Sequence, residues 1–513
     1  MGARVTVRSL LIAINSVVLC LTEYIALSHG KHQVALVALA VNVLNIVYIH
    51  LGFKTRNDYL KIFSFVTLLH LLHRIPFFVD PSRTGTYSPS LTVLGFASER
   101  EVTYSLLVIL AYLVVGGVTI LVCGQMFRLH LYLDRTSEID RDFSPLFVWY
   151  LLLQMVFLYD YLILGAARRG IESHPLGWIG LVLSSELALV LLAFGIFINW
   201  KRNDHAWFRF LATLYFVITL VITTVWGSRR GIYQYLTMGL ITMMTVWANR
   251  KWYFGLKKLV LASALILSAV ATYVIGTEYR RVVLFQSSRS TVEAIMSVDV
   301  AGRLSAVWDE RELVFQKIWY RMSQLDDVMI AILMETSRFA HEINVVNNLK
   351  VFANYLVIGD VFPGILPTGR AWEVDYYGTT LEEASENYNT FVPGAIGFSV
   401  ATFGVIWGLL GLSVVIWLFV VGAKWGSFWV PLGYRKYYAF AIYYLFFGHL
   451  IGGMGLDVLA FAICLWIIQA GLMVGFVTSY NVFRHSLFPR LRLEGYRDYE
   501  LSEPTSRSLD VTI

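Results

Sequence analysis

The chain has 513 residues, of which 57% are hydrophobic and only 15% are Asp, Glu, Lys or Arg. Soluble domains average about a quarter charged residues, so this composition excludes an ordinary soluble protein and predicts an integral membrane protein. The formal net charge is +6. It predicts no nucleic-acid partner, because the positive residues gather at the ends of apolar runs, as they do in membrane proteins.

Apolar runs near the length of about 20 residues that a helix needs to cross the hydrocarbon recur along the chain. They predict an all-α fold, a polytopic membrane helical bundle of about twelve transmembrane helices. The third run is the weakest, because His70, His73 and Arg74 interrupt it and Pro76 follows. The expected spans are 8–28, 32–53, 60–79, 102–123, 145–166, 176–199, 207–226, 232–249, 257–276, 394–422, 436–452 and 456–478.

Lys and Arg predict the orientation of these spans, since cytoplasmic loops carry the excess of positive charge. With the N-terminus in the cytoplasm, most of the cations, Lys61 among them, fall on the cytoplasmic side, and so does the basic tail. We therefore expect both termini in the cytoplasm.

The predicted connection at 277–390 is long, external and not continuously apolar. We expect it to form a helical cap on the outer ends of the bundle. Within it an amphipathic helix is predicted over about 310–340 by apolar residues at helical spacing: Val314, Ile318, Met322, Leu325, Met329 and Ile332. The expected organisation is a nine-helix membrane bundle over 1–276, the cap over 277–390, a three-helix membrane segment over 391–480 and a tail over 481–513.

Ionisable side chains in the predicted spans gather at the outer ends, and Glu186 near the middle of its span is the main exception. Charged groups inside a membrane are costly and usually functional, so the asymmetry predicts a polar cavity open to the outside beneath the cap. The simpler alternative is that each group reaches the lipid headgroups on its own. The outer groups are Glu23, His73, Arg74, Asp160, Arg229, Arg230, His449 and Asp457.

The segment 226–231 reads Trp-Gly-Ser-Arg-Arg-Gly and places Arg229 and Arg230 between two apolar runs, at the predicted outer face. Glycine and serine let the backbone turn tightly there, and the N-terminus of the next helix favours an anion. A guanidinium group donates two parallel hydrogen bonds and keeps its charge, which suits a diphosphate. The two arginines are therefore the first candidates for binding an anionic group.

The external connection adds further candidates. Arg280 and Arg281 follow the ninth predicted span at the outer face. A His, Asp or Glu side chain there could act as a general base if it reaches a substrate hydroxyl. For Arg321, Asp326 and His341, a solvated helix face is the simpler alternative. The candidates on the predicted amphipathic helix or at its end are Arg321, Asp326, Glu335 and His341.

Motifs for a nucleotide or a metal are absent from the sequence. It has no Gly-rich loop followed by Lys and Ser or Thr, no Asp-x-Asp pair well placed for a metal-bound nucleotide sugar, and no histidine spacing typical of metal ligands. An enzyme of this kind needs a substrate that is already activated and membrane-borne. A lipid-linked diphosphate, with its anionic head and apolar tail, fits these requirements, and no metal or other cofactor is expected.

The layout resembles the bacterial O-antigen polymerases, part of the broader oligosaccharide repeat-unit polymerase family and related to the O-antigen ligases. The shared features are the many spans, the turn at 227–231 and one large external loop late in the chain. After that loop, 393–397 (Pro-Gly-Ala-Ile-Gly) and 402–408 (Thr-Phe-Gly-Val-Ile-Trp-Gly) resemble the Gly-rich helix of the family. The resemblance spans roughly 200–425. The family is also described by an Arg followed ten residues later by Gly in its external loops, and those loops have no clear copy of it here.

The resemblance implies a polyprenyl-diphosphate-dependent glycosyltransferase of the bacterial inner membrane, with the large loop in the periplasm. A hydroxyl of one lipid-linked unit would attack the anomeric carbon of a glycan held on undecaprenyl diphosphate, in O-antigen, capsule or exopolysaccharide synthesis. Membrane lipids and a chain-length regulator protein are the implied partners. Diphosphate contacts would fall to Arg229, Arg230, Arg280 and Arg281, with Arg321 next, and activation of the acceptor to His341, Glu335 or Asp326.

Three alternatives stay open. An O-antigen ligase would use the same parts to pass the glycan to the lipid A core of lipopolysaccharide. A transporter or flippase for lipid-linked oligosaccharide would have ionisable groups at mid-membrane, broken helices and two similar halves. A structural subunit of an envelope assembly would need no cavity.

Overall fold

The computed structural model describes residues 4–79, 98–126, 324–334, 342–357, 361–378, 394–429 and 442–453, with a few short stretches and single positions elsewhere. This part is helical, apart from a two-residue strand β1 (Arg4–Val5) that pairs antiparallel with β2 (Trp252–Tyr253). Five of its helices are long and apolar enough to cross a membrane. The all-helical, multi-pass membrane class is therefore confirmed for this part, and most of the other predicted spans lie outside the described residues.

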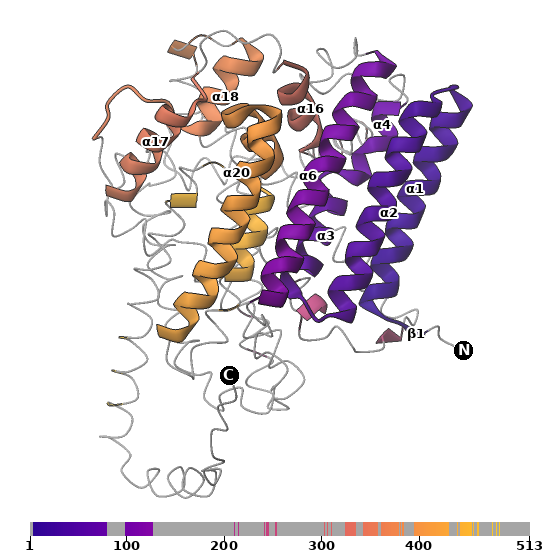
Figure 1. The fold of residues 1–513 in the computed structure, drawn as a ribbon, viewed down its shortest axis with the longest axis horizontal. Helices are drawn as coiled ribbons and strands as arrows, with labels where there is room; N and C mark the ends of the chain where they lie inside the picture. Colours follow the sequence, from indigo (N-terminus) through magenta and orange to yellow (C-terminus); the bar gives the residue numbers. More distant parts are fainter. Residues whose placement is uncertain are drawn as a thin grey trace, which may run out of the picture.

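The five candidate spans match predicted spans closely and stand side by side (Figure 1). Three shorter helices, α16 (Leu325–Met334), α17 (Val345–Val357) and α18 (Thr368–Tyr377), lie at one end, which we call the cap end. The spans run to and from that end in the predicted alternating order. They are α1 (Val7–Ser28), α2 (His32–Lys54), the third span built of α3 (Asp58–His70), η1 (Leu72–Arg74) and α4 (Ile75–Val79), then α6 (Glu99–Met126) and α20 (Gly394–Trp429).

The described bundle exposes many large apolar side chains, as expected of helices that face lipid, and its largely apolar core also holds some polar side chains. On α1 the exposed side chains include Val17, at 66% exposure, and Leu21, whereas Asn15 and Thr22 are fully buried. The Asn15 side-chain amide donates to the backbone carbonyl of Asn42 on α2 at 2.9 Å. Polar groups therefore join α1 to α2, while aliphatic groups cover their outer surface.

The α20 span is not the continuous helix that the sequence predicts over 394–422. Gly404 has φ 79° and ψ 177°, and it separates 394–403 from 405–429. Glycine adopts this conformation readily because it has no Cβ. The hydroxyl of Tyr112 on α6 donates to the Val405 carbonyl at 2.9 Å, so a side chain supplies a hydrogen bond at the kink.

The predicted amphipathic helix over 310–340 is described only from 324 to 334, and this part is not amphipathic. All residues from Leu325 to Ile332 are buried, including Asp326 and Asp327. The apolar period of the sequence is real, but α16 packs against α6, α18 and α20 instead of lying with one face in water. A solvated helix face for Asp326 is therefore wrong, since its exposure is 0%.

Replacing Tyr112 with phenylalanine tests the kink. Tyr112→Phe removes the side-chain donor to the Val405 carbonyl, and we expect a loss of about 0.5–1.5 kcal/mol of stability, the net contribution of a typical hydrogen bond. The measurement is the thermal unfolding midpoint in detergent. Tyr104→Phe, on an exposed face of the same helix, is the control and should leave the midpoint unchanged. Equal midpoints for the two variants would show that the hydrogen bond does not support the kink.

Candidate functional site at the break in the third span

The third span breaks where the sequence places His70, His73, Arg74 and Pro76. In a continuous α-helix the Arg74 amide would donate to the His70 carbonyl, but here it donates to Leu71 at 3.2 Å, as in a 3₁₀ turn. Pro76 has no amide hydrogen and is tolerated only because α4 begins there. The predicted interruption is therefore confirmed, and it leaves the His70 carbonyl available to another segment.

That carbonyl accepts a hydrogen bond from the start of α16. The Gln324 amide donates to His70 at 2.9 Å, and the Gln324 carbonyl accepts from the Val328 amide at 3.0 Å. Gly394, the first residue of α20, lies directly against the Gln324 side chain with φ +65°, and a Cβ there would overlap the Gln324 amide oxygen. Three helix ends that are distant in sequence therefore meet: the end of α3, the start of α16 and the start of α20.

A buried ion pair lies at this meeting point. Arg74 Nε is 3.4 Å from Asp326 Oδ1, and the two side chains are 6% and 1% exposed. The guanidinium group also lies 5.1 Å from the centre of the Phe77 ring, within the range of a cation–π contact. Asp326 stands in the first turn of α16, where the helix dipole favours a negative charge.

The carboxylate of Asp326 is incompletely satisfied. Its second oxygen, Oδ2, is buried and has no hydrogen-bond donor in the described part of the chain. Burial raises the pKa of Asp326 to about 6, although Arg74 acts in the opposite direction. The 3.4 Å contact is longer and simpler than the two-pronged geometry that makes Arg–carboxylate pairs strong. The cap end therefore holds a carboxyl group whose pKa is close to neutral pH.

A small cavity lies at the junction of His70 and Gln324, between the third span, α6, α16, α20 and η10 (Phe446–Ile451), a π-helical turn. Its volume is about 30 Å³, enough for about two water molecules and too small for a sugar. Most of the lining is apolar, and the polar side chains come from Thr67, His70, Tyr112 and Gln324. The cavity can hold water at the junction but is too small to bind a substrate.

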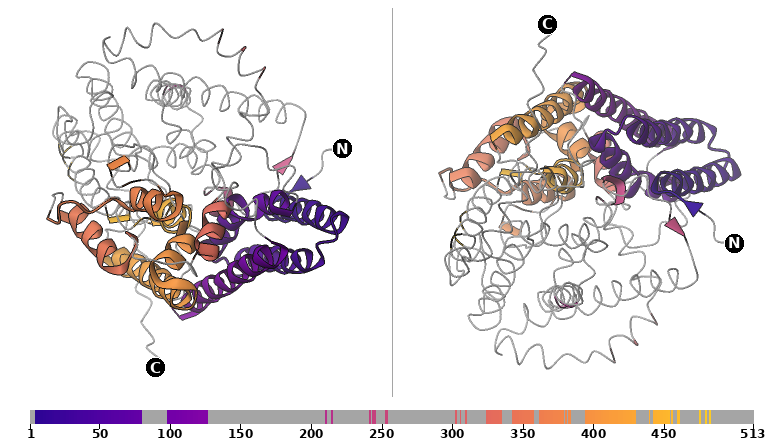
Figure 2. Two further views of the ribbon diagram at one scale, coloured as in Figure 1. Left: turned by 90° about the horizontal axis from the view of Figure 1, so that it is seen from above. Right: turned by 90° about the horizontal axis from the view of Figure 1, so that it is seen from below.

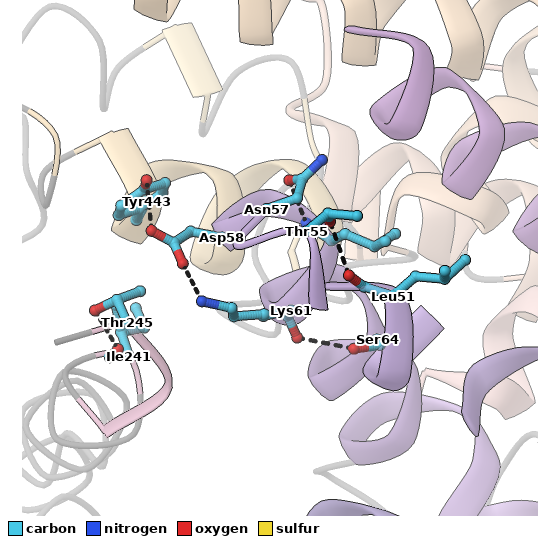
Figure 3. Close-up of polar contacts among 10 residues, drawn as sticks. Leu51, Thr55, Asn57, Asp58, Lys61, Ser64, Ile241, Thr245 and Tyr443 are labelled. Carbon is cyan, nitrogen blue, oxygen red and sulfur yellow. Dashed lines mark hydrogen bonds and ion pairs between the residues drawn. The ribbon is translucent and has the colours of Figure 1, made fainter. Parts of the chain in front are cut away.

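A second buried ion pair lies at the opposite end of α3 (Figure 3). Lys61 Nζ is 2.6 Å from Asp58 Oδ1, and the Tyr443 hydroxyl donates to Asp58 Oδ2 at 3.2 Å. The Lys61 ammonium also lies 5.2 Å from the centre of the Phe53 ring. Lys61, predicted as a cation of the cytoplasmic side, is only 4% exposed. Asp58 and Tyr443 are not among the predicted site residues, although the opposite charges of Asp58 and Lys61, three residues apart at the start of a span, were a visible signal.

The described residues cover only part of the predicted site. Among the predicted catalytic and diphosphate-binding residues, Asp326 is described, and it is brought together with Arg74, one of the predicted outer groups. The side chain of His73 is buried next to it, and that of Glu23 is partly buried near the cap end of α1. The others lie outside the described residues: Arg229, Arg230, Arg280, Arg281, Arg321, Glu335 and His341.

Comparisons with known proteins add no relative. No protein-family model, no curated protein and no solved structure matches the chain. Within the described residues, no group of three or more His, Cys, Asp or Glu side chains could hold a metal ion. The chemistry available at the cap end of this part is therefore that of a guanidinium group, a carboxyl group with a raised pKa and the ends of three helices.

Removing the cation of the second pair should destabilise the protein. Lys61→Met leaves the Asp58 carboxylate buried without its counter-ion, and we expect a loss of about 3–5 kcal/mol. Lys54→Met, at the exposed end of α2, removes the same charge without this effect. The thermal unfolding midpoints of the two variants in detergent provide the measurement. If both unfold at the same temperature, the Lys61–Asp58 pair contributes nothing to stability.

Because the pKa of Asp326 is raised in the folded state, the stability of the protein should change with pH in a defined direction. The carboxyl has a pKa near 3.8 when unfolded and about 6 when folded, so between these values the folded state holds a proton that the unfolded state has lost. Stability should therefore fall as the pH rises from about 4 to 6, by on the order of 3 kcal/mol.

Asp326→Asn should remove this part of the pH dependence, because the amide does not titrate. Unfolding midpoints measured from pH 4 to pH 7 provide the test. Glu382→Gln, in the exposed part of the cap, is the matched control and should keep the slope. An unchanged slope in Asp326→Asn would show that Asp326 titrates at the same pH in the folded and unfolded states.

Proposed function

We propose that the protein is a membrane glycosyltransferase of the bacterial inner membrane, which polymerises undecaprenyl-diphosphate-linked oligosaccharide units at the periplasmic face. The observation that carries the proposal is the buried, incompletely bonded Arg74–Asp326 pair at the cap end. Such a pair is costly in a membrane protein and is usually kept for function. It lies where a lipid-linked diphosphate would present its anionic head.

The described spans support this assignment by the position of their charges. In α1, α2, α6 and α20, all Asp, Glu, Lys and Arg residues stand within about two turns of a helix end. An anionic headgroup at the membrane surface needs charges at such a depth, while its apolar tail needs none. The arrangement fits a substrate whose reactive part stays at one surface.

The proposed reaction needs no further energy source. The acceptor hydroxyl loses its proton to a general base, and its oxygen bonds to the anomeric carbon of the donor sugar. The bond from that carbon to the diphosphate oxygen breaks, and undecaprenyl diphosphate leaves with the electron pair. Arginines stabilise the charge that develops on the leaving group. Arg229 and Arg230 are the proposed diphosphate contacts, joined by Arg280 and Arg281.

The burial of Asp326 changes its proposed role. A carboxyl with 0% exposure does not reach a substrate hydroxyl in this conformation. Asp326 is better suited to fixing the start of α16 on the third span. Arg321 and Glu335 flank the described segment 324–334 in sequence, so the same anchor would help to position them. Glu335 and His341 are then the preferred candidates for the general base.

A transporter or flippase is the second candidate, and one specific observation favours it. Two described spans are discontinuous, the third at 71–74 and α20 at Gly404, and broken helices are common in transporters. The described spans carry no charged group at mid-membrane, however, and binding at that depth is typical of such transporters. A ligase, which would pass the glycan to a lipid A core, shares every feature used above.

Purified protein in liposomes distinguishes these functions. Supplied with undecaprenyl-diphosphate-linked repeat units, without nucleotide or metal, it should produce a ladder of longer glycans. Arg229→Ala and Arg230→Ala should each lower the rate by about 100-fold or more. Arg100→Ala, an exposed arginine at the start of α6, is the control and should retain the full rate.

Two outcomes would contradict the proposal. Full-rate synthesis by intact Arg229→Ala and Arg230→Ala proteins would exclude these residues as diphosphate contacts. Movement of the lipid-linked unit across the bilayer with no ladder would identify a flippase instead of a polymerase.

A further inference from the structure

The cap helix α17 has its polarity reversed relative to a helix on a water-facing surface. Its exposed side chains are all aliphatic among those the structure describes: Val345 at 44%, Val346 and Leu349 at 59%, and Val357 at 65%. The polar residue Asn348 is 3% exposed and points inward. Its side-chain amide donates to the hydroxyl of Thr402 on α20 at 3.0 Å.

The exposed residues form one stripe. Val346, Leu349 and Val357 are separated by three and eight residues, spacings that place them on one face of a helix. Val361 and Phe362, directly beyond the helix, are also exposed, at 52% and 38%. An apolar stripe with polar residues behind it is the arrangement of a helix that faces lipid and bonds to protein.

The backbone at Phe362, after the end of α17, is also suited to an apolar environment. The Phe362 amide donates to the side-chain oxygen of Asn354 at 2.8 Å, and the Asn354 side-chain amide donates to the Phe362 carbonyl at 3.0 Å. Both polar groups of the Phe362 backbone are therefore bonded within the protein. Lipid requires this, since it offers no hydrogen-bond partners.

Exposed aromatic residues mark the cap-side surface of the membrane. Tyr24 and Tyr104 are 71% and 46% exposed and stand near the cap ends of α1 and α6, and Trp and Tyr gather at membrane–water interfaces. Trp407 lies deeper, because the neighbouring Val405 carbonyl accepts a hydrogen bond from Tyr112, which is about 12 Å further along α6 than Tyr104 at 1.5 Å per residue. The exposed surface of α20 near Trp407 therefore faces the hydrocarbon.

The attachment point of α17 lies within a candidate membrane span. Thr402, which binds Asn348, stands a few residues before Trp407 and on its cap side. In Figure 1, α17 lies beside the upper part of α20, below the level of the upper ends of α1 and α6, and in Figure 2 it lies at the edge of the described helices. The exposed side chains of α20 that follow this attachment point, such as Ile406 and Trp407, are apolar as well.

We infer that α17 is an interfacial membrane helix, with its aliphatic stripe inserted among the lipid acyl chains of the cap-side leaflet. Lys350, which is partly exposed on the same helix, can extend its ammonium group to the lipid headgroups. The inference is independent of the proposed function, because any multi-pass protein could hold such a helix. It places part of the cap within the membrane surface and not in water.

Spin labels on single cysteines test this placement in nanodiscs of phosphatidylethanolamine and phosphatidylglycerol. In a protein whose Cys20, Cys123 and Cys464 are replaced by alanine, labels are placed by Leu349→Cys and, independently, Val346→Cys. Collision rates with oxygen, which enters lipid, and with a nickel chelate, which stays in water, are compared. Ile406→Cys, 75% exposed on α20, is the lipid reference, and Glu382→Cys, exposed in the cap, is the water reference.

At both α17 positions we expect an oxygen-to-nickel ratio close to that of Ile406→Cys and several-fold above that of Glu382→Cys. A ratio equal to that of Glu382→Cys would place α17 in water and overturn the inference. Shielding from both reagents, with dipolar broadening between labels, would also overturn it, since a second copy of the chain would then cover the stripe. Using two positions keeps the test valid if one variant fails to fold.

Discussion

The backbone of a membrane helix must satisfy its own hydrogen bonds, because lipid offers no partners, and this constraint organises the cap end. Two spans break there, and each break is supported from elsewhere in the fold. The Gln324 amide donates to the His70 carbonyl, and the Tyr112 hydroxyl donates to the Val405 carbonyl. The hydrogen bonds at the two breaks therefore connect helices. One connects α16 to the third span, and the other connects α20 to α6.

The third span is the centre of the described bundle, which explains why it can carry buried charges. In its most apolar 18-residue stretch 83% of the residues are buried, against 28% in α1 and 22% in α20. A charge on α1 or α20 would face lipid, whereas one on α3 meets protein partners on every side. Lys61 pairs with Asp58 at one end and Arg74 with Asp326 at the other. Such pairs add little net stability, but losing one partner is costly, so they fix how the helices are arranged.

The cap combines two environments within a short distance. The start of α16 is enclosed by protein and holds a carboxyl group with a raised pKa, whereas α17 presents aliphatic side chains outward. If α17 lies in the interface, the Arg74–Asp326 pair stands close to the depth of lipid phosphates. A site at this depth suits a substrate whose tail stays in the bilayer while its headgroup reacts. The proposed polymerase and the inferred interfacial helix rest on different residues, yet both place chemistry at the same surface.

The sequence by itself determined the helices, because length and apolar character decide whether a segment can cross a membrane. Expected spans such as 8–28 and 32–53 differ from the observed helices by one residue at an end. The interruption near Arg74 was also predictable, since proline and charged residues break a span for local reasons. The alternating direction of the spans then followed from their order in the chain.

Only the tertiary structure decided which distant groups meet. Arg74 and Asp326 are 252 residues apart, and no local pattern pairs them. The kink at Gly404 was not predictable, since glycine also occurs in continuous membrane helices. Periodicity misled at α16, where packing on all sides buries both faces. A periodic stripe shows that a helix has two faces, but only its neighbours determine which face meets protein and which meets lipid.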